Sequence, residues 1–370
     1  MNYDDRSIAE HEKFRGKIEI SSKVPLEGMD DLSAYYTPGV AEPCRRIAND
    51  PEEAYKLTPK GNMVAVVTDG SAVLGLGNIG ALAGYPVMEG KCLLFKKFAG
   101  IDAFPICIDT QDTEELIRTI KAISPQFGGI NLEDISAPRC FEVERRLDEE
   151  LPVPVFHDDQ YGTAIVVLAG LINALKIVPK SDPRIVISGA GAAGLAIGKL
   201  LMAYSGWQTI VCDSKGILSE DREDLNEYKK ELAAQESGSL ADALKDADVF
   251  IGVSAPGIVS KEMIGSMAKD PIVFALANPD PEIDPEFAKE AGAKIVATGR
   301  SDYPNQINNA LVFPGLFRGA LDNRVPFITH NMKIAAAEAL ADLISSPTAD
   351  RIIPNIFDEG VVDSISKVIK

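Results

Sequence analysis

Two pairs of adjacent carboxylates stand in apolar or glycine-rich stretches of the sequence. Glu133 and Asp134 occur in GGINLEDIS, and Asp158 and Asp159 occur in VPVFHDDQYGTA. A buried carboxylate usually needs a cation. Because no cluster of His or Cys accompanies these acids, oxygen ligands indicate a hard divalent ion, Mg²⁺ or Mn²⁺, rather than zinc. The alternative is that one acid of each pair caps a helix. The neighbouring His157 is interpreted as a structural residue.

A lysine and a tyrosine could supply proton chemistry. The segment PVMEGKCLLFKKFAG is compatible with a helix or a strand, and a helix places Lys91 on the apolar side and Lys97 on the opposite side. A lysine on a buried face tends to have a lowered pKa, as a general base near neutral pH requires. We therefore expect a lowered pKa for Lys91, unless its side chain extends to solvent or begins a strand. Tyr36, ahead of a turn, could donate a proton into a cleft or simply pack.

A glycine-rich run predicts a dinucleotide site. The strand RIVIS is followed by GAGAAG and the apolar helix LAIGKLL, and these glycines permit a tight turn and a close approach to a pyrophosphate. The next strand ends in Asp213, which could accept hydrogen bonds from the ribose hydroxyls of NAD, whereas Lys215 could bind the 2′-phosphate of NADP. The positions of the run assigned to the cofactor are Gly189, Gly191, Ala192 and Gly194.

Other candidate contacts lie in turns. A second run, from Gly75 to Gly80, lacks a strand-ending acid and has either a structural role or direct contact with substrate or cofactor. Asn278 follows the strand IVFAL at its carboxyl end, the edge where open α/β sheets bind ligands. It is predicted to contact substrate or nicotinamide, or to form a turn. Asn309, in QINNALVFPG, could cap the following segment.

Two α/β domains are expected to position these groups. In the first half, VAVVT, FPICI and VPVF are typical of strands, and EELIRTIKAIS and RCFEVERRL are typical of helices. From Arg184 onward, β-branched runs alternate with helical stretches, which predicts a Rossmann-type, doubly wound parallel sheet with closing helices after Arg324. We expect a substrate and metal domain at residues 1–157 and a dinucleotide-binding domain at 158–370, with the hinge between Phe156 and Asp182.

Composition excludes several classes of partner. The 37 Lys and Arg against 55 Asp and Glu give a formal net charge of −18, which repels nucleic acid and anionic lipid. The N-terminal MNYDDRSIAEHEKF lacks the apolar core of a signal peptide, and we expect no apolar run of the roughly 18 residues that a membrane span needs. A cytoplasmic location is predicted. The five cysteines are widely spaced, so we expect reduced and mostly buried thiols.

Eight segments together resemble the successive signatures of malic enzyme, the decarboxylating malate dehydrogenase. They follow that family's order and cover most of the chain: YYTPGVAEPC, VTDGSAVLGLGNIG, PVMEGKCLLFK, INLEDIS, FHDDQYGTA, ISGAGAAG, ALANPDPE and QINNALVFPG. The resemblance implies oxidation of L-malate and decarboxylation to pyruvate, with NAD or NADP and Mg²⁺ or Mn²⁺. The alternatives are oxaloacetate decarboxylation, another 2-hydroxy acid, or a cofactor-binding regulator without catalysis.

The resemblance also implies roles for single residues. Tyr36 corresponds to the general acid, Lys91 to the general base, and Asp158 to a residue that orients the lysine. The remaining matches are the metal ligands Glu133, Asp134 and Asp159, the substrate contacts Asn278 and Asn309, and the dinucleotide positions Gly191, Ala192, Gly194 and Asp213. Larger animal forms carry an arginine for the substrate carboxylate where this chain has Ala72. The compact length is similar to the small branch of the family and implies a homodimer.

Overall fold

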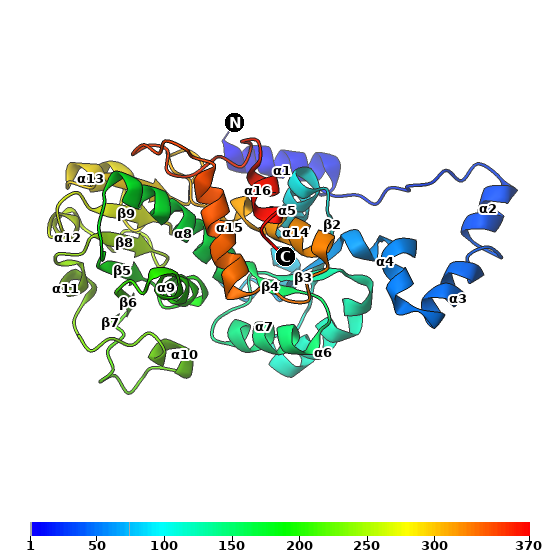
Figure 1. Cartoon of the computed structure of the whole chain (residues 1–370), viewed down its shortest axis with the longest axis horizontal. Coiled ribbons are helices and arrows are strands. Elements are labelled where there is room, and N and C mark those ends of the chain that lie inside the picture. Colours follow the sequence, from blue (N-terminus) through cyan, green and yellow to red (C-terminus); the bar gives the residue numbers. More distant parts are fainter. Residues whose placement is uncertain (1, 74) are drawn as a thin grey trace.

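The computed structural model describes residues 2–73 and 75–370. Figure 1 shows two groups of strands, each surrounded by helices, and a helical arm that leaves the body after the first helix. The first sheet has four parallel strands in the order β2-β1-β3-β4. Its strands are β1 (Met63–Thr68), β2 (Asp102–Cys107), β3 (Gly129–Leu132) and β4 (Val155–His157).

Both faces of the first sheet are covered by helices. The central strand β1 is almost entirely buried, as its apolar sequence MVAVVT requires in a parallel sheet. Apolar side chains of α6 and α7 pack on one face, and those of α5 pack on the other. The bounds are α5 (Ala81–Ala99), α6 (Thr113–Ile123), η3 (Ser124–Gln126) and α7 (Arg139–Glu150). Strand β3 was not predicted, because the short run GGINL opens with glycines that are unusual in strands.

The second sheet has six strands in the order β10-β9-β8-β5-β6-β7. This is the order of a dinucleotide-binding fold, with the switch point between β5 and β8. The prediction of an all-parallel sheet needs one correction, because the edge strand β7 runs antiparallel to β6. The strands are β5 (Ile185–Ser188), β6 (Thr209–Asp213), β7 (Gly216–Ile217), β8 (Val249–Gly252), β9 (Ile272–Ala275) and β10 (Ile295–Thr298).

Helices cover both faces of the second sheet, which confirms the doubly wound α/β prediction. One face packs against α8 and α9, and the other packs against α11, α12 and α13. The bounds are α8 (Asp158–Ile177), α9 (Ala192–Ser205), α10 (Glu227–Lys230), α11 (Leu240–Leu244), α12 (Lys261–Gly265) and α13 (Pro285–Glu290).

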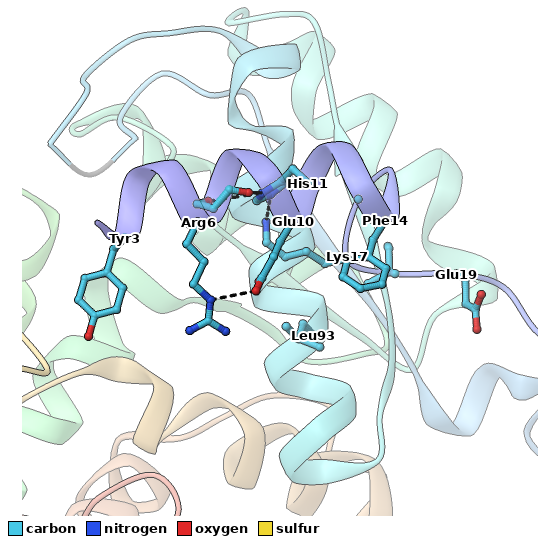
Figure 2. A pocket seen from close by; sticks show the side chains of 11 residues that line it. Tyr3, Arg6, Glu10, His11, Phe14, Lys17, Glu19 and Leu93 are labelled. Atoms are coloured by element: carbon cyan, nitrogen blue, oxygen red, sulfur yellow. Dashed lines mark hydrogen bonds and ion pairs between the residues drawn. The ribbon is translucent and has the colours of Figure 1, made fainter. Parts of the chain in front are cut away.

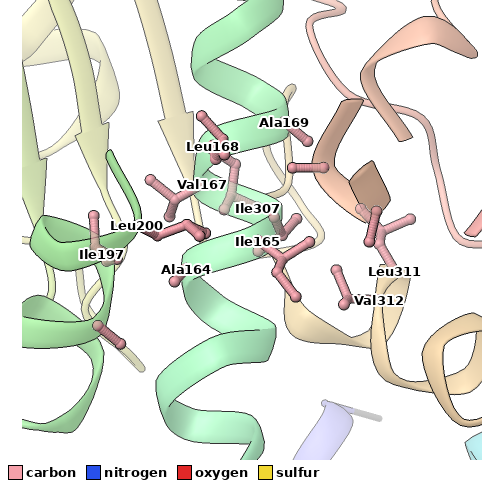
Figure 3. Packing of buried hydrophobic residues seen from close by; sticks show 14 of the residues in the cluster. Ala164, Ile165, Val167, Leu168, Ala169, Ile197, Leu200, Ile307, Leu311 and Val312 are labelled. Atoms are coloured by element: carbon pink, nitrogen blue, oxygen red, sulfur yellow. The ribbon is translucent and has the colours of Figure 1, made fainter. Parts of the chain in front are cut away.

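Helix α8 joins the two halves of the molecule. Its middle turns, from Ala164 to Leu171, are buried against α9 and against the segment that holds Ile307 and Leu311 (Figure 3). By length and composition this helix could cross a membrane, so the expectation that no apolar run reaches that length is wrong. Burial explains its apolar sequence, since 67% of the apolar 18-residue stretch of the helix lies inside the protein.

The closing helices predicted after Arg324 are present as α15 and α16, and the helix before them, α14, packs against α5 of the first half. The ring of Phe95 on α5 lies 4.7 Å from that of Phe313 and 5.4 Å from that of Phe317, both on α14. The closing elements are η4 (Asn309–Leu311), α14 (Phe313–Asn323), α15 (His330–Asp342) and α16 (Val361–Ser366). The exact domain boundary at residue 157 stays a prediction.

The N-terminal segment forms the arm. Figure 1 shows α1 lying on the body and α2 and α3 far from both sheets. The bounds are α1 (Tyr3–Phe14), α2 (Met29–Tyr35), α3 (Ala41–Asn49), η1 (Pro51–Glu53), α4 (Ala54–Leu57) and η2 (Pro59–Asn62). All five cysteines are free, with Cys92, Cys140 and Cys212 buried and Cys44 exposed, so the prediction of mostly buried thiols is confirmed.

Candidate active site

Lys91 lies at the centre of a buried cluster of charges. It is on α5, as the helical interpretation predicts, and it is only 8% exposed, while Lys97 is exposed. Its Nζ lies 2.5 Å from Oδ2 of Asp158 and 2.8 Å from Oε1 of Glu133. The ammonium also lies 4.3 Å from the centre of the Phe313 ring. The side chain is therefore held from three sides.

The expected lowered pKa of Lys91 is wrong for this arrangement. Burial alone would lower the pKa, but the charges and hydrogen bonds of Asp158 and Glu133 outweigh burial and raise it. Burial also raises the pKa of Glu133 and of Asp158 to about 7 each, although the lysine opposes that rise. Burial thus raises the pKa values of the two carboxyls, and the same carboxyls raise that of the lysine.

The topology of the first sheet brings these groups together. Glu133 directly follows β3, and Asp158 begins α8 directly after β4. Strands β3 and β4 are parallel neighbours, so their carboxyl ends meet at one edge of the sheet. The backbone N–H of Asp134 donates to Oδ2 of Asp159 at 2.8 Å, which ties the two loops to each other. All four predicted acids therefore lie in one cluster.

Three of these acids can hold a metal ion. Carboxylate oxygens of Glu133, Asp134 and Asp159 lie within 4.8 Å of one another, and the first two residues are buried. Burial raises the pKa of Asp159 to about 6. An excess of buried carboxylates over cations is costly, and oxygen donors at this spacing suit Mg²⁺ or Mn²⁺. The residues present therefore fit a hard divalent cation.

His157 behaves as the structural residue that the sequence suggested. It is fully buried, and burial together with the charge of Lys91 lowers its pKa to about 3, so the imidazole is neutral. Its backbone N–H donates to Glu144 Oε1 at 2.9 Å, and Gln160 Nε2 donates to Oε2 of the same residue at 2.7 Å. Glu144 thus supports the start of α8. It was missed because a glutamate within the polar helix RCFEVERRL gives no sign of an inward position.

Asn309 and Asn278 lie beside the junction of the two halves. A Cβ built on Gly162 of α8 would lie 1.8 Å from Oδ1 of Asp158 and 3.1 Å from Cβ of Asn309, so Asn309 adjoins the charged cluster. A Cβ on Gly75 would lie 3.2 Å from the carbonyl oxygen of Asn278. The second glycine run therefore meets the loop after β9. Leu74, directly before that run, lies outside the described residues.

Two glycines of the dinucleotide run lie so close to neighbouring backbone that a side chain would not fit, as the motif predicts. Gly189 has φ +114°, and a Cβ there would lie 2.5 Å from the carbonyl oxygen of Val253. A Cβ on Gly194 would lie 1.7 Å from the carbonyl oxygen of Gly189, whereas one on Gly191 would meet no atom within 4 Å. Gly191 caps α9, which begins at Ala192, so backbone N–H groups face the open space. A cavity of about 560 Å³ adjoins Gly189 and Asp213.

Asp213 is held by two cations. Arg222 donates to both of its carboxylate oxygens, at 2.8 Å and 2.9 Å, and Lys229 donates to Oδ2 at 2.7 Å. Burial opposes ionisation, but these hydrogen bonds lower the pKa of Asp213. Lys215 donates its backbone N–H to Asp213 and pairs its ammonium with Asp224. Arg222 and Lys229 lie 9 and 16 residues after Asp213, so the dinucleotide motif does not predict these contacts.

Tyr36 is not brought to Lys91 within a single chain. It directly follows α2, which Figure 1 shows on the projecting arm, and it is 67% exposed.

Two family models match most of the chain. A family model described as the malic enzyme N-terminal domain matches residues 15–148, and one described as the malic enzyme NAD binding domain matches residues 160–369. The chain belongs to the malic enzyme family. It is 56% identical to an NAD-dependent malic enzyme of Geobacillus stearothermophilus, over 100% of the chain and 78% of that protein.

Further malic enzymes resemble the chain over most of their length. A bifunctional malic/malolactic enzyme of Bacillus subtilis is 55% identical, over 100% of the chain and 92% of that protein. The crystal structure of an NAD-dependent malic enzyme from Thermotoga maritima superposes with a TM-score of 0.95 at 49% identity, covering 98% of each chain. Relatives are named both NAD- and NADP-dependent, including an NADP-dependent malic enzyme of Halomonas elongata at 52% identity, over 96% of the chain and 89% of that protein. The family is therefore established, and the choice of cofactor is a separate question.

The loop that carries Ala72 is tied to the acidic cluster by its backbone. The N–H of Ala72 donates to the carbonyl oxygen of Asp134 at 2.9 Å. Nearby, Arg139 Nη2 lies 2.5 Å from Oδ2 of buried Asp69 and donates to Ser71 Oγ at 2.9 Å. Arg139 thus fixes the loop that carries Ala72. Sequence analysis did not single it out, because one arginine in a charged helix gives no signal.

Proposed function

We propose that this malic enzyme oxidises L-malate and decarboxylates the product to pyruvate, using NAD and a divalent metal. The observation that carries the proposal is the contact of Lys91 with both Asp158 and Glu133, next to the three-carboxylate cluster. A regulator without catalysis has no use for a buried lysine joined to a metal-binding set.

Each residue of the cluster has a proposed task. Glu133, Asp134 and Asp159 would hold Mg²⁺ or Mn²⁺. When bound, the metal would polarise the C2 oxygen for hydride transfer to nicotinamide, and it would stabilise the enolate left when the resulting oxaloacetate loses CO₂. Lys91 removes the proton of the C2 hydroxyl, and Asp158 keeps its Nζ in position. The lysine becomes a better base once a cation shares Glu133, because the negative charge that raises its pKa is then partly neutralised.

Tyr36 is proposed to protonate C3 of enolpyruvate, which requires a second chain. Its exposed position on the arm leaves the single-chain site without a proton donor from this residue. We therefore favour a homodimer in which the arm of each chain completes the site of the other. The arm carries further exposed apolar residues, as expected of a covered surface: Ile20, Leu26 and Met29.

The face of α1 and α5 is a second part of the proposed dimer surface. A cavity of about 690 Å³ lies there between Phe14 of α1 and Leu93 of α5 (Figure 2). Figure 2 also shows Arg6 paired with Glu10 and Lys17 in contact with His11 at its margin. Exposed apolar side chains of this kind lose contact with water when a second copy covers them.

NAD is proposed over NADP because Asp213 borders the cofactor cavity as an ionised carboxylate. A carboxylate can accept both ribose hydroxyls and repels a 2′-phosphate. The opposing feature is the group of cations around it, Arg222, Lys229 and Lys215. A location in the cytoplasm, with no nucleic acid or membrane partner, remains our prediction.

The first test follows reduced nicotinamide by absorbance with L-malate, Mn²⁺ and either NAD or NADP, beside a pyruvate assay. Metal-dependent reduction with matching pyruvate supports the proposal. Reduction without pyruvate would indicate a simple dehydrogenase, and turnover of oxaloacetate alone would indicate a decarboxylase. Faster turnover with NADP would assign the cations around Asp213 to the 2′-phosphate.

The shared site is tested by mixing variants. Tyr36→Phe and Lys91→Ala chains, refolded or co-expressed together, should recover about a quarter of native activity, because half of randomly paired dimers are mixed and each has one intact site. If both residues act within one chain, mixing recovers nothing. Light scattering of the native protein reports whether the dimer exists.

A further inference from the structure

The carboxylate of Glu282 lies behind the cofactor cavity. The residue is 0% exposed and forms no ion pair with any residue in the described ranges. Burial raises the pKa of this carboxyl, and the groups that oppose the rise are backbone N–H groups and one hydroxyl. A buried carboxylate with no cation is unusual, because desolvation is not offset by an opposite charge. Its hydrogen-bond partners should therefore explain its presence.

Those partners belong to two neighbouring loops. The N–H of Ser254, after β8, donates to Oε1 at 2.8 Å, and the Ser254 hydroxyl donates to the same oxygen at 3.3 Å. The N–H of Ala277, after β9, donates to Oε2 at 3.0 Å. Each oxygen accepts from a different loop, so the carboxylate bridges the carboxyl ends of two adjacent parallel strands.

Both loops border the cofactor site. Ser254 lines the cavity together with Ser188 and Gly189, and its hydroxyl lies 3.0 Å from that of Ser188 at the end of β5. Ala277 directly precedes Asn278, the predicted contact for substrate or nicotinamide. Glu282 therefore connects the loop beneath the dinucleotide run with the turn that presents Asn278.

The surrounding backbone is built closely around this carboxylate. A Cβ on Gly252, the last residue of β8, would lie 2.3 Å from the carboxyl carbon of Glu282. The backbone N–H of Val259 donates to the carbonyl oxygen of Glu282 at 3.1 Å, which fixes the residue's own main chain. An apolar side chain of similar size would leave the N–H groups of Ser254 and Ala277 without an acceptor.

We propose that Glu282 is a positioning residue for the nicotinamide cofactor. Its carboxylate sets the distance between the Ser254 loop and the Asn278 turn, and so the shape of the cavity that receives the dinucleotide. Glu282 acts through these loops and does not itself contact the cofactor. The inference rests on the proposed cofactor site.

The test compares Glu282→Gln with a matched control, Asp248→Asn. Asp248 is also a carboxylate that accepts a backbone N–H, that of Arg184 at 3.0 Å, but it lies at the opposite, amino edge of the same sheet. NADH binding is measured by fluorescence, Mn²⁺ binding by electron paramagnetic resonance, and the apparent KM for NAD and for malate by absorbance.

In Glu282→Gln, an amide NH₂ replaces one carboxylate oxygen. It cannot accept the hydrogen bond of the backbone N–H that it faces. We expect the Kd for NADH and the KM for NAD to rise about tenfold, which corresponds to about 1.4 kcal/mol. The Kd for Mn²⁺ should stay within about twofold, because the proposed metal ligands lie at the carboxyl edge of the first sheet, whereas the KM for malate changes only as far as Asn278 contacts the substrate. Asp248→Asn should leave all four constants near native values.

Several outcomes would overturn the inference. If Glu282→Gln binds NADH as the native protein does and only its Tm falls, the residue is merely structural. Equal weakening of NADH and Mn²⁺ binding would indicate that the whole fold is destabilised, and the residue would again be merely structural. If Glu282→Gln does not fold, Glu282→Asp is used instead, because it keeps both acceptor oxygens. Its Kd for NADH must then rise while its Kd for Mn²⁺ stays near the native value. A native chain that binds neither NADH nor NADPH refutes the proposed cofactor site itself.

Discussion

Replacing Lys91 with alanine should abolish malate oxidation without abolishing cofactor binding. The ammonium contacts Asp158 Oδ2 at 2.5 Å and Glu133 Oε1 at 2.8 Å, and the side chains of these acids are 0% and 5% exposed. The variant therefore loses the proposed base and leaves two buried carboxylates without their cation. The dinucleotide run and its cavity lie in the other half of the molecule and keep their contacts.

The size of each effect follows from this geometry. Losing a positioned general base costs about 10²- to 10⁴-fold in rate. Removing one partner of a buried ion pair costs about 3–5 kcal/mol of unfolding free energy. Protonation of Glu133 and Asp158, whose pKa values burial raises to about 7, recovers part of that loss near neutral pH. Mn²⁺ should bind more tightly than in the native protein, because the ammonium no longer competes for Glu133.

The assay follows NADH production with malate and Mn²⁺, with NADH binding by fluorescence and Tm by circular dichroism as checks on folding. Lys97→Ala is the matched control, since Lys97 is an exposed lysine on the same helix. It should leave rate, affinity and Tm unchanged. A folded Lys91→Ala protein that keeps more than about a tenth of the native kcat would refute the assignment of Lys91 as the base.

Three further predictions concern the metal, a buried lysine and the glycine run. Asp159→Asn should raise the Kd for Mn²⁺ at least about tenfold in resonance titrations, with NADH affinity unchanged, and an unchanged Kd would remove Asp159 from the ligand set. Burial lowers the pKa of Lys333 on α15 to about 8 against the opposing charges of Glu144 and Asp148. Between that pH and the ordinary lysine value of 10.5, the unfolded chain binds a proton that the native protein does not, so this residue makes stability rise with pH, by up to about 1.4 kcal/mol per pH unit. Urea titrations of Lys333→Met should lack that contribution, and an identical slope in both proteins would contradict it. Gly191→Ala should weaken NADH binding with little change in Tm. Gly194→Ala should lower both the NADH affinity and the Tm, because its Cβ would crowd the carbonyl of Gly189 at a cost of about 1–3 kcal/mol. Equal melting temperatures of the two variants would count against this distinction.

The local features of the site could be predicted from short stretches of sequence. Helical periodicity placed Lys91 on a buried face, and the structure confirms that position. The glycine spacing and the strand before it predicted the turn at Gly189 and the start of α9. Both depend on residues within one or two turns of each other, where backbone conformation is decided locally.

Properties that depend on distant partners could not be predicted in this way. The pKa of Lys91 rises because Asp158 lies 67 residues further along the chain yet 2.5 Å away in space. Strand β3, which presents Glu133, is too short and too glycine-rich to recognise alone. The role proposed for Tyr36 depends on a second chain, and a single chain's sequence gives no information on such a contact.

Helix α8 has a consequence for how this enzyme can be divided or recombined. Asp158 and Asp159 stand in its first turn, while its middle turns form the core that supports the dinucleotide-binding sheet. A cut at residue 157 would therefore leave the first domain without its lysine-orienting acid and without one proposed metal ligand. A chimera of malic enzymes joined after Ile177 keeps both acids with the first sheet, and it requires an incoming cofactor domain whose α9 fits the apolar surface of α8.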